Sequence, residues 1–255
     1  MKLKRYDRYI PTTENKRTLR VLLPDDYELS DKSYAVLYMH DGQNLFEDET
    51  AYGETSWKVK DTMETLRQNN LIIVGIDNSD LRLSEYSPWL CVLDSERFKN
   101  TKIGGLGDVY AEWLVHDLKP WVDKTFRTKK EDSLIAGSSM GAYISVYIAT
   151  LYSELFSHVG VFSLASWFNE EKFINHIASQ QINHNQRYFI SVGRNETSDE
   201  TKKDFNELYI RNSRNLIKAL HDKGVKDIMY IETDDIHNEL AWRKRFVDFI
   251  NYIAY

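Results

Sequence analysis

The sequence predicts an α/β fold built on a mostly parallel sheet with helices on both faces, and three observations support this. Apolar runs of strand length alternate with segments of helical periodicity along the 255 residues, which is typical of parallel strands joined by helices. The 4 prolines and 11 glycines are spread out, so no linker is evident. A hydrophobic share of 42% is sufficient for a large core. We therefore expect a single domain over residues 1–255.

Eight strands and six helices are expected. The strands are predicted at residues 4–10, 17–23, 35–39, 71–76, 134–136, 159–163, 188–192 and 228–231. The first two are hairpin-like and more polar than the others, which favours an antiparallel edge. Helices are predicted at residues 56–68, 108–126, 140–152, 170–178, 201–223 and 239–252.

Composition argues against several function classes. A net charge of −6 and a pI near 5.7 argue against a nucleic-acid partner. No stretch approaches the length of a membrane span, and the N-terminus lacks the apolar region of a signal peptide. Cys91 is the single cysteine, which excludes an internal disulfide and fits a cytoplasmic location. Its apolar neighbours should raise the pKa of the thiol, so we interpret Cys91 as a packing residue.

Residues 137–141, Gly-Ser-Ser-Met-Gly, form a G-x-S-x-G motif between an apolar strand and an amphipathic helical segment. A serine hydroxyl must be exposed to act as a nucleophile, and a sharp strand-to-helix turn at Ser139 provides that exposure. Gly137 and Gly141 are expected because the helix packs closely against the strand there. The alternative is a glycine-rich helix start that only caps the helix.

A turn of this kind after the fifth of eight strands is the arrangement of an α/β-hydrolase. That fold predicts an acid after a later strand and a histidine last in the chain. His237 follows the last strand and is the expected base. The loop after residues 188–193 supplies the acid, for which we favour Glu196 and keep Asp199 as the alternative, since Asp199 is also placed to cap a helix.

The oxyanion of an acyl-transfer intermediate needs two backbone donors. The amide of Met140 follows the nucleophile, and the turn at residues 40–44 follows the third strand. Gly42 is expected to let the chain bend so that the amide of Gln43 or Gly42 faces the site. Taken alone, this turn is an ordinary polar turn, and its position in the fold is what favours the oxyanion role.

The connection between residues 78 and 107 is long, and connections of this length are usually functional or disordered. Its aromatic residues favour order. Substrate contacts are expected from residues of this loop, of the 40–44 turn and of the segment after the sixth strand; they are Asp41, Asn44, Arg82, Tyr86, Trp89 and Trp167. Plain core packing is equally consistent with the aromatic ones. No nucleotide-binding motif and no metal-ligand spacing is present, so no cofactor or metal is expected.

Six segments together resemble the Putative esterase family, which includes esterase D, feruloyl and acetyl-xylan esterases, enterochelin-type siderophore esterases and the antigen 85 mycolyltransferases. They are residues 38–46, 74–78, 85–89, 137–141, 192–196 and 236–238. The resemblance covers nearly the whole chain. It implies Glu196 as the triad acid and the absence of a separate lid domain. Ala142 departs from the second glycine that many relatives carry, and no loss of activity is expected from it.

These features predict a serine carboxylic-ester hydrolase that acts through an acyl-enzyme on small soluble esters, such as acetyl or hydroxycinnamoyl esters of sugars. A siderophore-ester hydrolase or an acyltransferase would use the same triad, and a non-catalytic binding protein on the same fold is a weaker alternative. The rate should rise with pH, because the base must be unprotonated. The sequence leaves the oligomeric state open.

Overall fold

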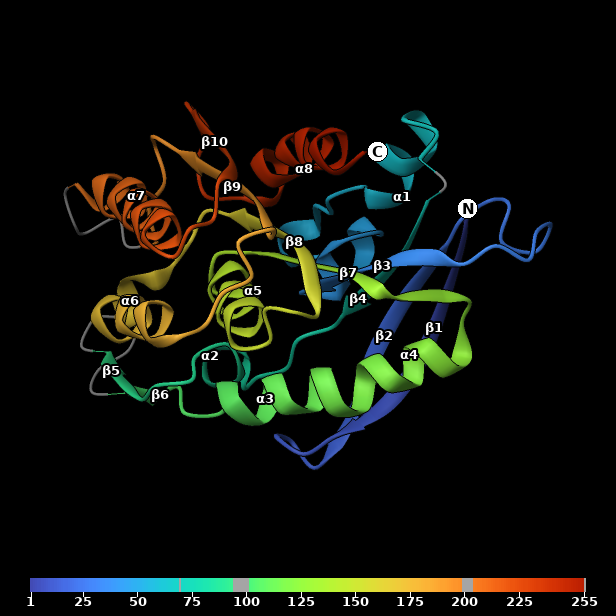
Figure 1. The fold of residues 1–255 in the computed structure, drawn as a ribbon, viewed down its shortest axis with the longest axis horizontal. Coiled ribbons are helices and arrows are strands. Elements are labelled where there is room, and N and C mark those ends of the chain that lie inside the picture. The colour runs from blue at the N-terminus through green and yellow to red at the C-terminus, as the bar shows by residue number, and fades with distance from the viewer. Residues whose placement is uncertain (69, 94–100, 199–203, 255) are drawn as a thin grey trace.

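The computed structural model describes residues 1–68, 70–93, 101–198 and 204–254, and it contains all eight predicted strands (Figure 1). These are β1 (Lys2–Ile10), β2 (Asn15–Leu23), β3 (Tyr34–His40), β4 (Leu71–Ile76), β7 (Thr128–Ser138), β8 (Phe156–Phe162), β9 (Arg187–Gly193) and β10 (Asp227–Thr233). They form one sheet in the order β1-β2-β4-β3-β7-β8-β9-β10. The fold is that of an α/β-hydrolase.

The sheet is parallel except at its N-terminal edge. β4, β3, β7, β8, β9 and β10 pair in parallel, whereas β1 and β2 pair with each other, and β2 with β4, in antiparallel register. Every residue of β3 and β4 is buried, as expected for strands that are covered on both faces. Because the six parallel strands point the same way, their carboxyl ends and the loops that follow meet at one edge.

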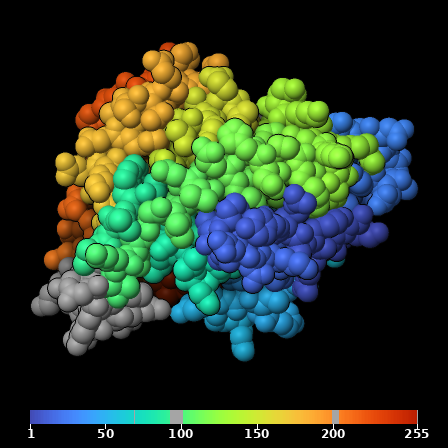
Figure 2. Space-filling model, turned by 90° about the horizontal axis from the view of Figure 1, so that it is seen from below, coloured from blue at the N-terminus to red at the C-terminus, as the bar shows by residue number. Residues whose placement is uncertain are grey.

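Helices cover both faces of the sheet (Figure 1). One core cluster joins the sheet to α3 (Gly107–Trp113), α5 (Met140–Leu151), α6 (Glu170–Ser179) and α7 (Phe205–Asp222). The cluster on the other face includes residues of α1 (Val59–Thr65) and α8 (Glu239–Ile253). Figure 2 views the first face, where the green segment that holds α3 crosses the centre beside the blue N-terminal strands.

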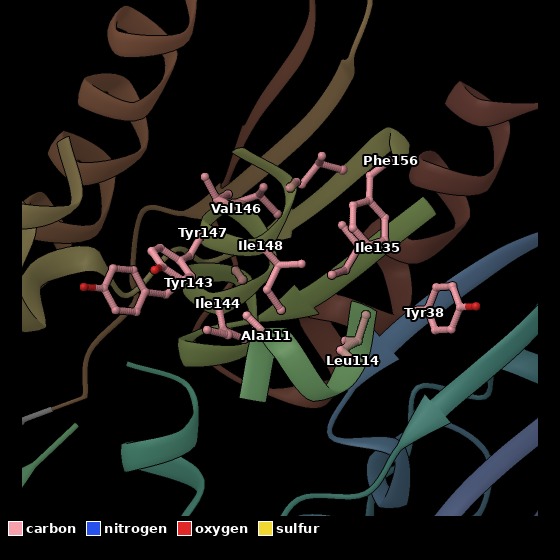
Figure 3. Packing of buried hydrophobic residues seen from close by; sticks show 14 of the residues in the cluster. Tyr38, Ala111, Leu114, Ile135, Tyr143, Ile144, Val146, Tyr147, Ile148 and Phe156 are labelled. Carbon is pink, nitrogen blue, oxygen red and sulfur yellow. The ribbon is translucent and has the colours of Figure 1, made fainter. Parts of the chain in front are cut away.

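Helix α5 is the most completely buried helix, and its position sets that of Ser139. Eleven of its residues, from Met140 to Thr150, are buried. Figure 3 shows its apolar side chains between the sheet residues Ile135 and Phe156 and the α3 residue Ala111. This packing fixes the start of α5, and therefore the turn that precedes it, against the sheet.

Two predicted helices differ in extent from those observed. The segment 108–126 is interrupted by a π-helical turn, Leu114–Leu118, before α4 (Lys119–Thr125). Pro120 has no N–H for the carbonyl of His116, so the hydrogen-bond register changes at this point. The segment 56–68 is helical only in α1, because the N–H groups of Trp57 and Val59 donate to Asn44 and Leu45 instead.

The long connection after β4 is ordered over its described residues. It contains α2 (Arg82–Glu85) and a small antiparallel hairpin of β5 (Cys91–Leu93) and β6 (Thr101–Ile103), which the sequence did not predict. Glu85 is fully buried and accepts a hydrogen bond from Arg17 Nη2 at 2.7 Å. Partial burial raises the pKa of the Cys91 thiol, in agreement with a packing role.

Within the described ranges, none of the helices combines the length and apolar character needed to cross a lipid bilayer. Only residues 163–169 lie between β8 and α6, so no lid domain is inserted there. The predicted helix at residues 201–223 corresponds to α7, and residues 201–203 lie outside the described part of the chain.

Candidate active site

Ser139 lies between β7 and α5 in a strained backbone conformation, with φ 56° and ψ −120°. Its N–H donates to the carbonyl of Phe162 at 2.8 Å, which ties the turn to β8. A Cβ on Gly137 would lie 2.5 Å from the carbonyl carbon of Gly141. The close contact between strand and helix therefore requires a glycine, as the motif predicts, and it holds Ser139 at the carboxyl edge of the sheet.

The turn at residues 41–44 lies beside this elbow, since a Cβ on Gly141 would be 3.3 Å from Asp41 Oδ2. In this turn the residue with positive φ is Asp41, at 57°, whereas Gly42 does not have a positive φ. Gly42 is needed for a different reason, because a Cβ there would lie 2.7 Å from the carbonyl carbon of Gly75 in β4. Among the described residues, the N–H groups of Gln43 and Met140 donate to no other protein group.

The carboxylate of Asp41 holds this turn in place. Arg82 donates to it through Nε at 2.7 Å and Nη2 at 2.8 Å, and Asn78 Nδ2 donates at 2.6 Å. Burial raises the pKa of Asp41, but the charge and hydrogen bonds of Arg82, together with the Asn78 hydrogen bond, outweigh burial, so the pKa is lowered. Tyr86 is fully buried, accepts the Asp41 N–H and lies under the Arg82 guanidinium. Two residues expected to contact substrate, Arg82 and Tyr86, thus direct polar atoms to the turn.

Asn44 connects the turn to the segment that carries the histidine. Its Oδ1 accepts the N–H of Tyr52 at 2.9 Å, and its Nδ2 donates to Glu239 Oε1 at 3.4 Å. Glu239 is the first residue of α8, two positions after His237, and burial raises the pKa of its carboxyl. The side chain of Asn238 caps α8 by accepting the Ala241 N–H.

His237 and Glu196 lie in direct contact, with Nδ1 of the imidazole 2.9 Å from Oε2 of the carboxylate. The Glu196 side chain is 2% exposed and that of His237 is 14% exposed. The other carboxylate oxygen, Oε1, accepts Ser163 Oγ at 2.5 Å and the Gly193 N–H at 2.6 Å. Because a carboxylate only accepts, the Nδ1 of His237 carries the proton of this contact.

Two further residues complete this network. The indole N–H of Trp242 donates to Ser163 Oγ at 2.8 Å, and its ring meets that of His237 edge-on at 5.0 Å. A Cβ on Gly193 would lie 2.2 Å from the carbonyl oxygen of Asp235. Gly193 therefore lets the acid loop and the histidine loop touch, which brings Glu196 under the imidazole.

Ser139 and His237 share a neighbour, the buried Tyr209 of α7. Its ring centroid is 4.9 Å from that of His237. Burial raises the pKa of Tyr209 to about 12, while contacts of its hydroxyl with Ser198, Trp167 and Ser139 act in the opposite direction. The residues predicted as nucleophile and base therefore lie on the same side of the molecule.

The two tryptophans that were expected to contact substrate have different surroundings. Trp167 stacks on Phe168 at 3.9 Å and is close to Tyr209, so it lies beside the elbow. Trp89 packs against Tyr147 at 5.6 Å and His176 at 5.9 Å, between α5 and α6. Asp199, the alternative acid, lies outside the described residues.

Sequence reasoning missed three site residues: Ser163 as a partner of the acid, Trp242 and Tyr209. In the sequence, Ser163 is only the last residue of the predicted strand at residues 159–163. In the structure it takes a positive φ of 55°. Its partner Glu196 is 33 positions away and Trp242 is 79 away, so no local pattern relates them. The one available signal is that Trp242 lies five positions after His237, as the fourth residue of α8.

A family model described as "Putative esterase" matches residues 10–253. The YbbA protein of Bacillus subtilis (strain 168), described as uncharacterized, is 24% identical over 242 residues, which cover 93% of this chain and 92% of that protein.

Solved structures share the fold at low sequence identity. An IroE-like serine hydrolase from Shewanella oneidensis superimposes with a TM-score of 0.76 at 15% identity, over 98% of this chain and 80% of that one. A ferulic acid esterase gives 0.69 at 18% identity, over 97% and 95%. The enterobactin esterase FES from Shigella flexneri gives 0.72 at 16% identity, over 100% of this chain and 60% of that one.

Proposed function

The chain belongs to the Putative esterase family and is a carboxylic-ester hydrolase, and from this premise we propose that Ser139, His237 and Glu196 are its catalytic triad. His237 Nε2 takes the proton of Ser139 Oγ as that oxygen attacks the ester carbonyl. The imidazolium then protonates the departing alcohol. In the second half of the reaction His237 takes a proton from water, which attacks the acyl-enzyme, and returns the proton to Ser139 Oγ as the acid leaves.

The two N–H groups of Met140 and Gln43 are the proposed donors to the tetrahedral oxyanion. They lie on segments that the Gly141 and Asp41 contact holds together. A donor of this kind contributes about 3 kcal/mol to the stability of the transition state in comparable sites. The Arg82 and Asn78 hydrogen bonds to Asp41 keep the turn in one conformation, so no reorganisation is needed during the reaction.

The observation that carries the proposal is the contact between His237 and the buried carboxylate of Glu196. One carboxylate oxygen is occupied by two donors, and the other is left for the imidazole. This arrangement orients the ring and stabilises the imidazolium that forms during each step. A purely structural ion pair would not need a strained serine near the same tyrosine that packs against the imidazole.

For the substrate we propose small soluble esters, with acetyl or hydroxycinnamoyl groups on sugars or similar alcohols. The stacked rings of Trp167 and Phe168 beside Tyr209 offer an aromatic surface that suits a planar acyl group. Structural neighbours named as a ferulic acid esterase and an enterobactin esterase make hydroxycinnamoyl and siderophore esters the first two classes to compare. An acyltransferase would use the same triad and is distinguished by product analysis with competing alcohols.

The test is replacement of Ser139 by Ala, followed by assay of p-nitrophenyl acetate hydrolysis. We expect activity to fall to the background left by the oxyanion donors and binding, a loss of about 10⁶-fold in comparable enzymes. Ser145→Ala is the matched control. Ser145 is a buried serine of α5, the helix that follows Ser139, and its hydroxyl only donates to the Gly141 carbonyl.

A fluorophosphonate probe should label the wild-type protein and the Ser145→Ala variant at Ser139. It should leave Ser139→Ala unlabelled while circular dichroism shows an intact fold. Persistent turnover by Ser139→Ala, or labelling at another residue, would refute the triad. Labelling of Ser139 also excludes a binding protein that has lost the chemistry.

A further inference from the structure

Tyr209 is a buried polar residue at the proposed triad that the reaction scheme above does not use. Its side chain is fully buried on α7, and its ring packs at 43° against that of His237 with centroids 4.9 Å apart. His237 also meets the edge of Trp242 at 5.0 Å. Two aromatic side chains thus restrict the plane in which the imidazole lies.

The hydroxyl of Tyr209 has unusual surroundings for a core tyrosine. It hydrogen bonds to Ser198 Oγ, and the side chains of Trp167 and Ser139 lie near enough to oppose the rise of its pKa. Tyr188, which is equally buried on β9, offers a comparison, because its hydroxyl makes a single hydrogen bond to Gln186 at 2.9 Å. One partner satisfies a buried tyrosine hydroxyl, so burial alone does not account for the position of the Tyr209 hydroxyl near the nucleophile.

We propose that Tyr209 is a positioning residue of the esterase site, whose hydroxyl, held by Ser198, orients Ser139 Oγ toward the imidazole that its ring packs against. The inference rests on the proposed triad. A serine side chain has three staggered rotamers, and the productive one points its oxygen at His237 Nε2. A rigid phenol with two rotatable bonds, fixed on the buried face of α7, selects among these rotamers at little entropic cost.

The first test is Tyr209→Phe, which keeps the ring and removes the hydroxyl. We expect kcat for p-nitrophenyl acetate to fall about tenfold, with KM unchanged within about twofold, because substrate binding is untouched while the reacting oxygen is misplaced. The rate of fluorophosphonate labelling at Ser139 should fall by a similar factor. Tyr188→Phe is the matched control: it removes a buried hydroxyl from the amino end of β9 and should leave kcat unchanged.

A purely structural role predicts a different result. In that case Tyr209→Phe and Tyr188→Phe would lower the thermal unfolding midpoint alike, and both would keep the wild-type kcat and labelling rate, which would overturn the proposal. The triad itself would survive that outcome, because Ser139 would still be labelled. Failure of the triad is recognised separately, by turnover in Ser139→Ala.

A substrate series separates positioning of the nucleophile from contact with the substrate. For esters that share an acetyl group and differ in the alcohol, Tyr209→Phe should lower kcat/KM by the same factor throughout. A defect that changes with the alcohol would place the hydroxyl on the leaving group and overturn the positioning role. If Tyr209→Phe does not fold, Ser198→Ala replaces it: a severalfold lower kcat supports the proposal, and an unchanged kcat overturns it.

Discussion

Two histidines lie at opposite ends of the parallel strands, His158 near the amino end of β8 and His237 in the loop after the carboxyl end of β10, and their partners carry opposite charges. At the carboxyl end, the Nδ1 of His237 faces the carboxylate of Glu196 at 2.9 Å. Near the amino end of β8, Arg187 Nη1 donates to the Nε2 of His158 at 3.0 Å, and the Nδ1 of His158 is 2.9 Å from Ser157 Oγ. The strand register pairs His158 directly with Arg187.

The charge of the partner decides what each imidazole can do. A carboxylate at Nδ1 leaves Nε2 as the basic nitrogen and stabilises the protonated ring. A guanidinium that donates to Nε2 occupies the basic nitrogen, and burial together with the Arg187 charge lowers the pKa of His158 to about 4. The same residue type is therefore suited to proton transfer at one end of the sheet and locked as a neutral packing group at the other.

The arrangement behind each partner reinforces this difference. Ser163 and the Gly193 N–H donate to Glu196 and hold its second oxygen toward the imidazole. Arg187 in turn donates to Asp227 at 2.6 Å, and the Tyr252 hydroxyl donates to the same carboxylate at 2.6 Å. A buried network thus holds the proposed catalytic acid at one end, and a partly exposed network holds the partner of His158 at the other.

Among the changes around the two histidines, removal of the Glu196 charge should have the largest effect on kcat. Glu196→Gln should lower kcat by about 10⁴-fold, because a neutral amide neither holds the reactive tautomer nor stabilises the imidazolium. The assay is p-nitrophenyl acetate hydrolysis. The control is Glu232→Gln at the end of β10, where the carboxylate is held by Arg214 and Tyr230, and its activity should stay within about twofold of wild type. Equal activity in the two variants would contradict the role of Glu196.

A smaller effect is expected from the residue behind the acid. Ser163→Ala removes one donor to Glu196 and leaves the buried Trp242 N–H without its acceptor. The free energy of unfolding should fall by about 1–3 kcal/mol, and kcat by about tenfold because the carboxylate is less firmly placed. Urea denaturation and the ester assay measure the two quantities. A large loss of stability with unchanged kcat would show that Ser163 only supports packing.

The smallest effect on activity is expected at the amino end. The pKa of His158 is lowered by folding, so between about pH 6.5 and 4 the unfolded chain binds a proton that the folded protein does not. The contribution of His158 to the free energy of unfolding is fully present above that pH range. It falls as the pH drops through the range, by up to about 1.4 kcal/mol per pH unit. His158→Gln keeps an acceptor for Arg187 and should flatten this slope, with kcat unchanged.

Urea denaturation at a series of pH values would check this prediction. His40 and His176 remain in the variant, and burial lowers their pKa values to about 3 and about 4, so part of the slope should persist. An identical slope in the wild-type protein and His158→Gln would mean that His158 does not titrate differently in the folded and unfolded states.

The predictable part of the site consists of residues whose role is readable from their position in the chain. Gly137 and Gly141 flank Ser139, and His237 follows the last strand, so a local motif and the strand order sufficed. Arg82 and Asp41 were recognised as site residues from the same reasoning, but they bond to each other rather than stand free for a ligand. Sequence position indicates that residues are close in space. The direction in which a polar atom points depends on which hydrogen-bond partner lies beside it in the folded structure.

The residues that sequence reasoning missed depend on contacts between distant segments. Tyr209 and Trp242 are aromatic residues on amphipathic helices, where the apolar pattern explains them completely. Only the docking of α7 and α8 on opposite faces of the sheet brings both rings against the imidazole of His237. The positive φ at Asp41 was likewise unpredicted, because the neighbouring glycine was the more probable site for it by residue type.

The sequence by itself determined the order of the strands, the sharp turn at Ser139 and the chemical types of the three proposed catalytic groups, because hydrophobic periodicity and short motifs act through neighbours in the chain. The tertiary structure decided which carboxylate oxygen faces the imidazole, which charged side chain holds the turn at residues 41–44, and which histidine is held by a guanidinium. These are choices among partners far apart in sequence, and they follow from the close approach that a packed sheet allows.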